Sequence, residues 1–342
     1  METGKPLRLG VIGCGFFAQN HLSAWKEIEG VDLVAVCDVD PPKAQRAASS
    51  FAVPRLYTDA QDMFSKEHLD FVDIVTLPPS HRPLVQLAAN NGVGVICQKP
   101  IAWTLEDAQA MVEACRRAQV PFMVHENFRW QTPMRELKRV IDSGAIGRPF
   151  FGRISWRTGH DLFAAQPWLR ETPRFIVIEV AIHLLDLARF LFGDPQTVFC
   201  HTVRVNPSIC GEDVATIVLT MDGSTCVVDC SSATHNEPEN FPQTLVTIEG
   251  SQGTAYLGAD YQLQIMHSGS LKVQTVAIPA HAWAIAPWHV VQDSVFNIQR
   301  HWVECMQHGR TPETSGEDNL RVLELVLGAY ESAENNMVVR LV

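Results

Sequence analysis

Short runs of apolar residues alternate with helical patterns along the first 125 residues of the chain. The apolar runs are 9–12, 33–37, 71–77, 93–97 and 122–124, and the helical patterns lie at 16–25, 41–51, 81–90 and 104–119. Such alternation with wholly apolar strands is typical of a parallel sheet that helices cover on both faces. Thr104 and Asp107 have the spacing of a capping box, which marks the start of the last of these helices.

The pattern changes after about residue 128. Helices are predicted over 134–141, 176–192, 288–307 and 317–334, and strands over 150–157, 198–205, 214–221, 225–231, 245–248 and 254–257. Consecutive strands joined by tight turns predict an antiparallel sheet. We therefore predict two domains, 1–126 and 127–342, the second of α+β type with a large, mostly antiparallel, open sheet.

Charge and cysteine content narrow the classes of partner. The chain of 342 residues has 27 Lys and Arg against 38 Asp and Glu, a net charge of −11, which disfavours nucleic acid and anionic membrane surfaces as partners. Its nine cysteines include no C-x-x-C pair, which indicates a reducing cytoplasm. No apolar stretch reaches the roughly 20 residues of a membrane span. We expect a cytoplasmic protein that acts on a small molecule.

A glycine-rich turn after the first predicted strand is the sharpest local signal. It reads Gly13-Cys14-Gly15-Phe16-Phe17-Ala18 and opens a helix, which is the context of a Rossmann dinucleotide-binding fingerprint. Gly13 permits the tight turn, Gly15 lets backbone amides approach a pyrophosphate, and Ala18 allows close helix–strand packing. We predict that Gly13, Cys14, Gly15, Phe16 and Phe17 contact the cofactor.

Asp38 ends the next strand, 20 residues after Ala18. A carboxylate there accepts both ribose hydroxyls of NAD and repels the 2′-phosphate of NADP. We therefore predict NAD; Lys43 and Arg46, one helical turn further, keep NADP as the less favoured alternative.

A proline-rich segment follows the strand 71–77. Thr76-Leu77-Pro78-Pro79-Ser80-His81 lies at the carboxyl end of the predicted sheet, where cofactors bind. It is either a stiff strand–helix connection or a segment that packs against the bound cofactor. In the second interpretation Thr76, Pro78 and His81 contact the dinucleotide.

Three further motifs complete a series that resembles the Gfo/Idh/MocA family over nearly the whole chain. They are Gln98-Lys99-Pro100, the run from His125 to Trp130, and the run from Glu179 to Asp186. The resemblance implies an NAD-dependent dehydrogenase of sugars or polyols, and it adds Gln98 and Asn127 to the cofactor contacts. The chain departs from the family pattern at Gln98, where Glu is usual, and at 176–179, where a glycine run and Asp are usual.

The resemblance also suggests a substrate. The sequences of residues 13–21 and 156–160 are most similar to those of family members that oxidise D-apiose. This implies oxidation of an aldose at the anomeric carbon, which gives a lactone. Oxidation of a ring carbon of an inositol or glycoside, which gives a keto-sugar, is the alternative, as is a non-catalytic NAD-binding regulator of the same fold.

Dehydrogenation of a hydroxyl requires a base and a donor that stabilises the developing alkoxide. We assign the donor to Lys99 and the base to His183, with Glu179, four residues earlier on the same helix, orienting it or binding a sugar hydroxyl. Asp186 is interpreted as structural, capturing a backbone N–H or an arginine. Glu179 and His183 have a metal-ligand spacing, but no third ligand follows regularly, so no metal is predicted.

Carbohydrate sites combine aromatic faces with hydrogen-bonding side chains. The predicted substrate contacts beside Lys99 and His183 are Arg129, Trp156, Arg157, His160, Asp161 and Trp168. Retention of Lys99, Glu179 and His183 favours an enzyme over a regulator. We further expect a homo-oligomer, a dimer or tetramer, formed through the open face of the second sheet.

Overall fold

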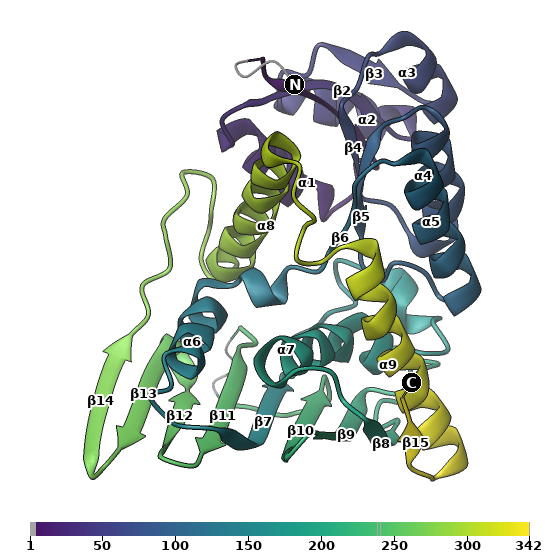
Figure 1. Cartoon of the computed structure of the whole chain (residues 1–342). Helices are drawn as coiled ribbons and strands as arrows, with labels where there is room; N and C mark the ends of the chain where they lie inside the picture. The colour runs from purple at the N-terminus through teal and green to yellow at the C-terminus, as the bar shows by residue number, and fades with distance from the viewer. Residues whose placement is uncertain (1–4, 238, 240, 342) are drawn as a thin grey trace. The chain divides into compact units, whose positions relative to one another are not determined.

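Six parallel strands form the first sheet of the computed structural model, which describes residues 5–237, 239 and 241–341 (Figure 1). Their order is β3-β2-β1-β4-β5-β6. The strands are β1 (Leu7–Ile12), β2 (Val31–Cys37), β3 (Arg55–Tyr57), β4 (Phe71–Ile74), β5 (Gly94–Gln98) and β6 (Phe122–His125). The order reverses between β1 and β4, and sheets of this kind bind ligands beyond the carboxyl ends of the strands at such a point. The predicted Rossmann-type parallel sheet is confirmed.

Helices connect these strands. They are α1 (Ala18–Glu27), α2 (Pro41–Ser50), α3 (Ala60–Lys66), η1 (Pro78–Ser80), α4 (His81–Asn90) and α5 (Leu105–Ala118). The predicted cap of α5 is present, since the Thr104 hydroxyl accepts a hydrogen bond of 3.2 Å from the backbone N–H of Asp107. A side-chain oxygen there satisfies one of the amides that a helix leaves open at its start.

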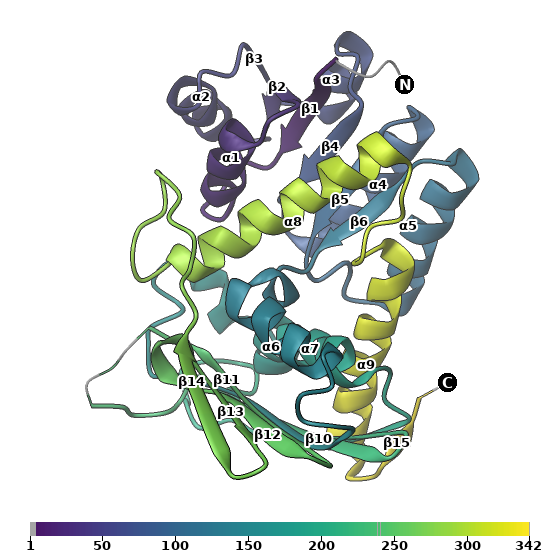
Figure 2. The same cartoon turned by 60° about the vertical axis from the view of Figure 1, so that its left-hand side comes forward.

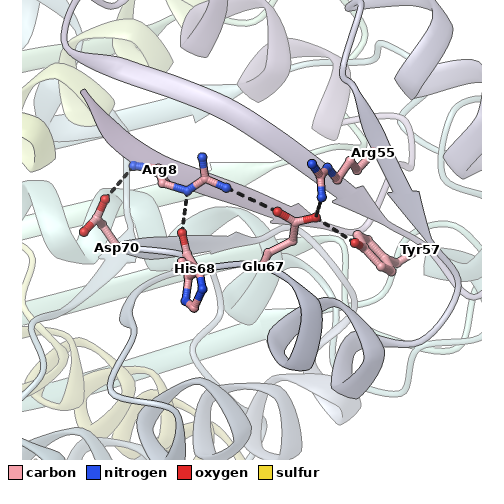
Figure 3. A network of polar contacts seen from close by, with 6 residues as sticks. All are labelled: Arg8, Arg55, Tyr57, Glu67, His68 and Asp70. Atoms are coloured by element: carbon pink, nitrogen blue, oxygen red, sulfur yellow. Dashed lines mark hydrogen bonds and ion pairs between the residues drawn. The ribbon is translucent and has the colours of Figure 1, made fainter. Parts of the chain in front are cut away.

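A cluster of ion pairs joins the end of α3 to β1 and β3 (Figure 3). The buried Glu67 carboxylate lies 3.3 Å from Arg8 Nη2 and 3.1 Å from Arg55 Nη1, and it accepts a 2.7 Å hydrogen bond from the Tyr57 hydroxyl. Burial, and secondly this hydrogen bond, raise the pKa of Tyr57. Arg8 Nε also donates to the His68 carbonyl at 2.6 Å. Three donors compensate the cost of burying one carboxylate.

The chain divides into two compact units. The first runs from the N-terminus to Asn127 and also contains Ala282–Ala284 and Val291–Leu323; the second holds Phe128–His281, Ile285–Val290 and the chain from Glu324 onward. Two of the boundaries therefore fall within the last two long helices, α8 (His289–His308) and α9 (Gly316–Asn335). This division differs from the single cut after residue 126 that the sequence suggests.

A nine-stranded sheet forms the second unit, in the order β14-β13-β12-β11-β7-β10-β9-β8-β15. Its strands are β7 (Pro149–Arg157), β8 (Thr197–Val203), β9 (Val214–Met221), β10 (Ser224–Ser231), β11 (Thr244–Gly250), β12 (Gly253–Leu257), β13 (Gln262–His267), β14 (Ser270–Thr275) and β15 (Val339–Arg340). β7 and β10 pair in parallel and the other neighbours are antiparallel. The predicted open, mostly antiparallel sheet is confirmed.

Helices pack on one face of this sheet. α6 (Thr132–Asp142) contacts β12, and α7 (Ile182–Phe192) contacts β7 and β10 (Figures 1 and 2). Along β7 the residues Gly152, Ile154 and Trp156 are buried, whereas Arg153 and Arg157, which point to the other face, are exposed. This alternation is the two-residue period of a strand with one covered face.

The helix predicted over 176–192 is not a single α-helix. It begins with a π-helical turn, η4 (Val177–Ala181), which continues into α7. Wide turns of this kind occur often at functional sites. Nine of the residues of α7 are buried, which explains its almost wholly apolar sequence.

Candidate functional site

The glycine turn fits a bound pyrophosphate. Gly13 has φ +98°, and a Cβ there would lie 2.3 Å from the Val75 carbonyl oxygen, so only glycine is compatible with this turn. Above Gly15 there is open space, with no atom within 4 Å of an added Cβ. Phe17, which precedes α1, makes no side-chain hydrogen bond to the helix start. The turn thus presents an open backbone surface at the positive end of a helix, as an anionic group requires.

This open surface gives a prediction. Gly15→Ala is expected to lower the affinity for NAD about tenfold, because the methyl group fills the space into which the pyrophosphate approaches. The melting temperature of Gly15→Ala should stay at the wild-type value, since nothing in the fold contacts the added methyl group. Gly13→Ala, in contrast, should have a lower melting temperature, because its methyl group would clash with the Val75 carbonyl. Calorimetric titration with NAD and thermal melts measure both; unchanged NAD binding by Gly15→Ala would contradict the assignment.

Asp38, directly after β2, binds the backbone of the glycine turn. Its carboxylate accepts hydrogen bonds from the backbone N–H groups of Cys14 at 2.7 Å and Asp40 at 2.9 Å. A carboxylate has about four acceptor positions, so it still has capacity for ribose hydroxyls. The residues present therefore fit the nucleotide that the sequence predicts.

The polar groups of the proline-rich segment 76–81 form hydrogen bonds within the first unit. Pro78 begins η1, and Thr76 Oγ1 accepts a 2.7 Å hydrogen bond from the Ser80 hydroxyl. His81 is fully buried, with its ring nitrogens 3.1 Å from the Ile101 carbonyl and 3.0 Å from the Thr76 carbonyl. Burial is the main cause that lowers its pKa. His81 thus links this segment to the Ile101 carbonyl inside the unit, and its cofactor contact stays a prediction.

Two other predicted cofactor contacts have internal partners. Gln98 is buried at the end of β5, and its side-chain oxygen accepts a 2.7 Å hydrogen bond from the backbone N–H of Lys99. Asn127 is buried and donates to the Ser294 hydroxyl at 2.6 Å. Lys99 itself is half-buried and precedes a cis peptide bond to Pro100.

The second unit fixes His183 by aromatic stacking. His183 lies in the first turn of α7 and its ring stacks on Phe128, with ring centroids 3.9 Å apart and planes 4° from parallel. Glu179 lies half-buried in the π-helical turn η4. Sequence reasoning did not single out Phe128, although it directly precedes Arg129 and Trp130 in the quoted motif.

Arg129 does not point to an open site. It forms a buried ion pair with Asp186, with its Nε donating to Oδ2 at 2.8 Å and Nη2 to Oδ1. The guanidinium also lies 5.5 Å from the Phe190 ring centroid. The prediction that Asp186 is structural and captures an arginine is therefore in agreement with the structure, and Asp186 binds two nitrogens of the Arg129 guanidinium. The substrate contact of Arg129 stays a prediction.

The remaining predicted substrate contacts divide between two groups. Trp156 is buried on the helix-covered face of β7, and Arg157, on the other face, donates to Asp229 at 3.0 Å. His160 and Asp161 are exposed, and Trp168 is half-buried in η3 (Pro167–Arg170). The strand period separates Trp156 from Arg157, so adjacent positions in sequence do not share one site.

Two aromatic residues that the sequence did not mark as site residues form an aromatic cluster with His160. The Phe241 ring centroid is 6.3 Å from the His160 ring and 5.0 Å from the Trp288 ring. Phe241 lies outside any helix or strand, and Trp288 lies in the turn just before α8; their aromatic type was the available signal.

Within the described part of the chain, no group of three or more His, Cys, Asp or Glu side chains is arranged to hold a metal ion. Among the same residues, no helix combines the length and apolar character that crossing a membrane requires.

Comparisons with known proteins agree with this architecture. Residues 7–126 match the model of an oxidoreductase family with an NAD-binding Rossmann fold, and residues 134–256 match the GFO/IDH/MocA C-terminal domain. The chain is 53% identical to a D-apiose dehydrogenase of Paraburkholderia graminis, over 99% of this chain and 91% of the relative. It is 48% identical to one of Rhizobium rhizogenes, over 97% of each chain.

A solved structure is also similar over nearly the whole length. It is an oxidoreductase from Agrobacterium radiobacter in complex with NAD+, L-tartaric acid and magnesium, 47% identical, with a TM-score of 0.97 and coverage of 98% of both chains. This chain is an NAD-dependent oxidoreductase and belongs to the Gfo/Idh/MocA family.

Proposed function

We propose that this enzyme oxidises D-apiose at the anomeric carbon and releases a lactone. The observation that carries the choice of substrate is the nearly full-length identity, 53% and 48%, to two proteins named D-apiose dehydrogenase. The glycine turn and Asp38 support the cofactor half of the proposal, because their geometry fits NAD.

Lys99 and His183 are proposed to handle the hydroxyl proton. Bound NAD supplies the hydride acceptor. The Lys99 ammonium donates a hydrogen bond to the reacting oxygen and stabilises the negative charge that develops there, while the His183 imidazole takes the proton. Stacking on Phe128 holds that imidazole in one orientation. Glu179 is proposed to orient His183 or to bind a sugar hydroxyl.

The sugar-binding residues are proposed among the exposed positions of the second unit. His160, Asp161 and Trp168 are accessible and combine hydrogen-bonding groups with an aromatic face. Phe241 joins them in this proposal because its ring lies next to His160, and Trp288 joins because its ring packs against Phe241.

Product analysis separates this proposal from ring-carbon oxidation. The second reaction has its own support, since a myo-inositol 2-dehydrogenase of Thermotoga maritima is 25% identical over 98% of both chains. We expect NMR and mass spectra of the D-apiose product to show a lactone or the acid formed by its hydrolysis. A keto-sugar that retains the anomeric proton would favour the alternative.

Asp38 is expected to impose a preference for NAD over NADP. Asp38→Ala should lower the ratio of kcat/KM for NAD to that for NADP about tenfold, because the carboxylate that pairs with ribose hydroxyls and repels a 2′-phosphate is lost. Asp32→Ala, an exposed carboxylate near the start of β2, is the matched control. Equal use of both cofactors by the wild type would contradict the prediction.

The open face of the second sheet is proposed as an oligomer interface. This face mixes half-buried apolar residues such as Val218 and Val227, which are paired across β9 and β10, with the ion pairs of Asp229. Val227→Lys should shift the assembly toward the monomer, whereas Val205→Lys, at an exposed position outside the strands, should not. Light scattering checks this; a wild-type mass of 38.0 kDa at micromolar concentration would refute the interface.

A further inference from the structure

Three buried polar side chains form a chain that ends at the backbone of Lys99. They are Asp73 on β4 and His21 on α1, both fully buried, and Gln98 on β5, which is 9% exposed. His21 Nδ1 lies 2.8 Å from Asp73 Oδ2, and His21 Nε2 lies 3.1 Å from Gln98 Nε2. Gln98 Oε1 accepts the 2.7 Å hydrogen bond from the N–H of Lys99.

The direction of every hydrogen bond in this chain follows from its last member. A backbone N–H only donates, so the Gln98 oxygen must face Lys99, and the Gln98 NH2 group must then face His21. An amide NH2 group donates, so His21 Nε2 must be the acceptor. The His21 proton therefore lies on Nδ1 and is donated to Asp73, which makes the imidazole neutral.

The surroundings hold His21 in this orientation. Trp25 Nε1 donates to the same Asp73 oxygen at 2.7 Å. The His125 ring lies 4.1 Å from the His21 ring, and the Phe17 ring contacts it edge-on at 5.5 Å. A ring enclosed in this way cannot exchange its two nitrogens without disturbing the sheet, and the carboxylate of Asp73, which accepts from Nδ1, requires the same tautomer as Gln98.

We propose that Asp73, His21 and Gln98 are positioning residues for Lys99, acting as one buried hydrogen-bonded relay; this inference rests on the proposed function of Lys99. The relay also explains why glutamine precedes Lys99. A neutral imidazole that presents a lone pair requires a donor at position 98, and glutamine supplies that donor together with an acceptor for Lys99.

Breaking the relay should reduce turnover without affecting cofactor binding. Gln98→Met keeps the size of the side chain and removes both hydrogen bonds. We expect kcat to fall about 10²-fold, the effect of a misplaced reacting group, while the KM for NAD stays within a factor of about two. Gln299→Met is the matched control, because Gln299 is fully buried on α8 in the same unit and makes no hydrogen bond to the relay. It should retain the wild-type kcat.

Gln98→Glu gives a pH signature that a merely structural residue would not. The glutamate keeps an oxygen for Lys99 but needs a proton on His21 Nε2. Asp73 from β4 and His125 from β6 face this ring, and a second carboxylate beside it accepts a hydrogen bond from the ring only when Nε2 carries a proton. The protonated imidazole completes the relay, so the ratio of variant to wild-type kcat should approach one at about pH 6 and fall as the pH rises toward about 9.

Three results decide the matter. Wild-type turnover by Gln98→Met would overturn the relay, and so would a Gln98→Glu ratio that does not respond to pH. The second criterion applies even if Gln98→Met does not fold. Lys99→Ala, assayed alongside, tests the proposed function separately. If Lys99→Ala kept its turnover, the catalytic role of Lys99 would be wrong. If Lys99→Ala were inactive while Gln98→Met stayed fully active, only the relay would be rejected.

Discussion

Lys99→Ala and His183→Ala should each lower kcat by about 10² to 10⁴, with NAD affinity close to that of the wild type. Lys99→Ala removes the donor that stabilises the developing alkoxide, and His183→Ala removes the base. Steady-state kinetics with NAD and D-apiose measure the loss, and quenching of the fluorescence of the eight tryptophans reports NAD binding. Lys66→Ala, which removes an exposed lysine of α3, should keep full activity.

The double variant tests whether the two groups act on one proton. Its kcat should fall much less than the product of the two single losses, because each single variant already disables the same step. Full turnover by either single variant would remove that residue from the mechanism. A loss of NAD binding would instead move the residue to the cofactor site.

Asp186→Asn is expected to lower the free energy of unfolding by about 3–5 kcal/mol, because it leaves the Arg129 guanidinium buried without its counter-charge. The side chains of this pair are 7% and 0% exposed. Asp107→Asn is the matched control, since Asp107 pairs with Arg82 and the two side chains are 41% and 40% exposed, so its loss should be clearly smaller. Urea denaturation of the three proteins measures the difference.

Replacement of both partners sharpens this test. Arg129→Met combined with Asp186→Leu removes both charges and should recover most of the stability that Asp186→Asn loses. If the double variant were as unstable as the single one, the cost would come from packing around Phe190 and not from an uncompensated charge.

Local pattern was sufficient to predict the parallel sheet, the cap of α5 and the dinucleotide turn. Each of these depends on residues within one strand–helix unit, and Gly13 and Thr104 have the conformation or the hydrogen bond that their positions require. β13 and β14 were missed although apolar and polar residues alternate along both, as in Leu271-Lys272-Val273. Both strands lie at one edge of the second sheet, where Leu271 and Val273 are exposed, so the pattern there is short and does not mark a buried face.

The site was harder to predict because its contacts are long-range. Arg129 meets Asp186 across 57 residues, and Gln98 meets His21 across 77. A motif shows that a polar residue follows a strand, but it does not show whether the side chain turns outward to a ligand or inward to a partner. His81 and Arg129 turn inward for this reason, and each satisfies buried groups that its own segment cannot satisfy.

The formation of NADH from NAD and D-apiose tests the central claim most directly. Its absorbance should rise on addition of catalytic amounts of enzyme, with a higher kcat/KM for D-apiose than for myo-inositol under the same conditions. Absence of NADH formation with D-apiose, or a higher kcat/KM for myo-inositol, would contradict the account.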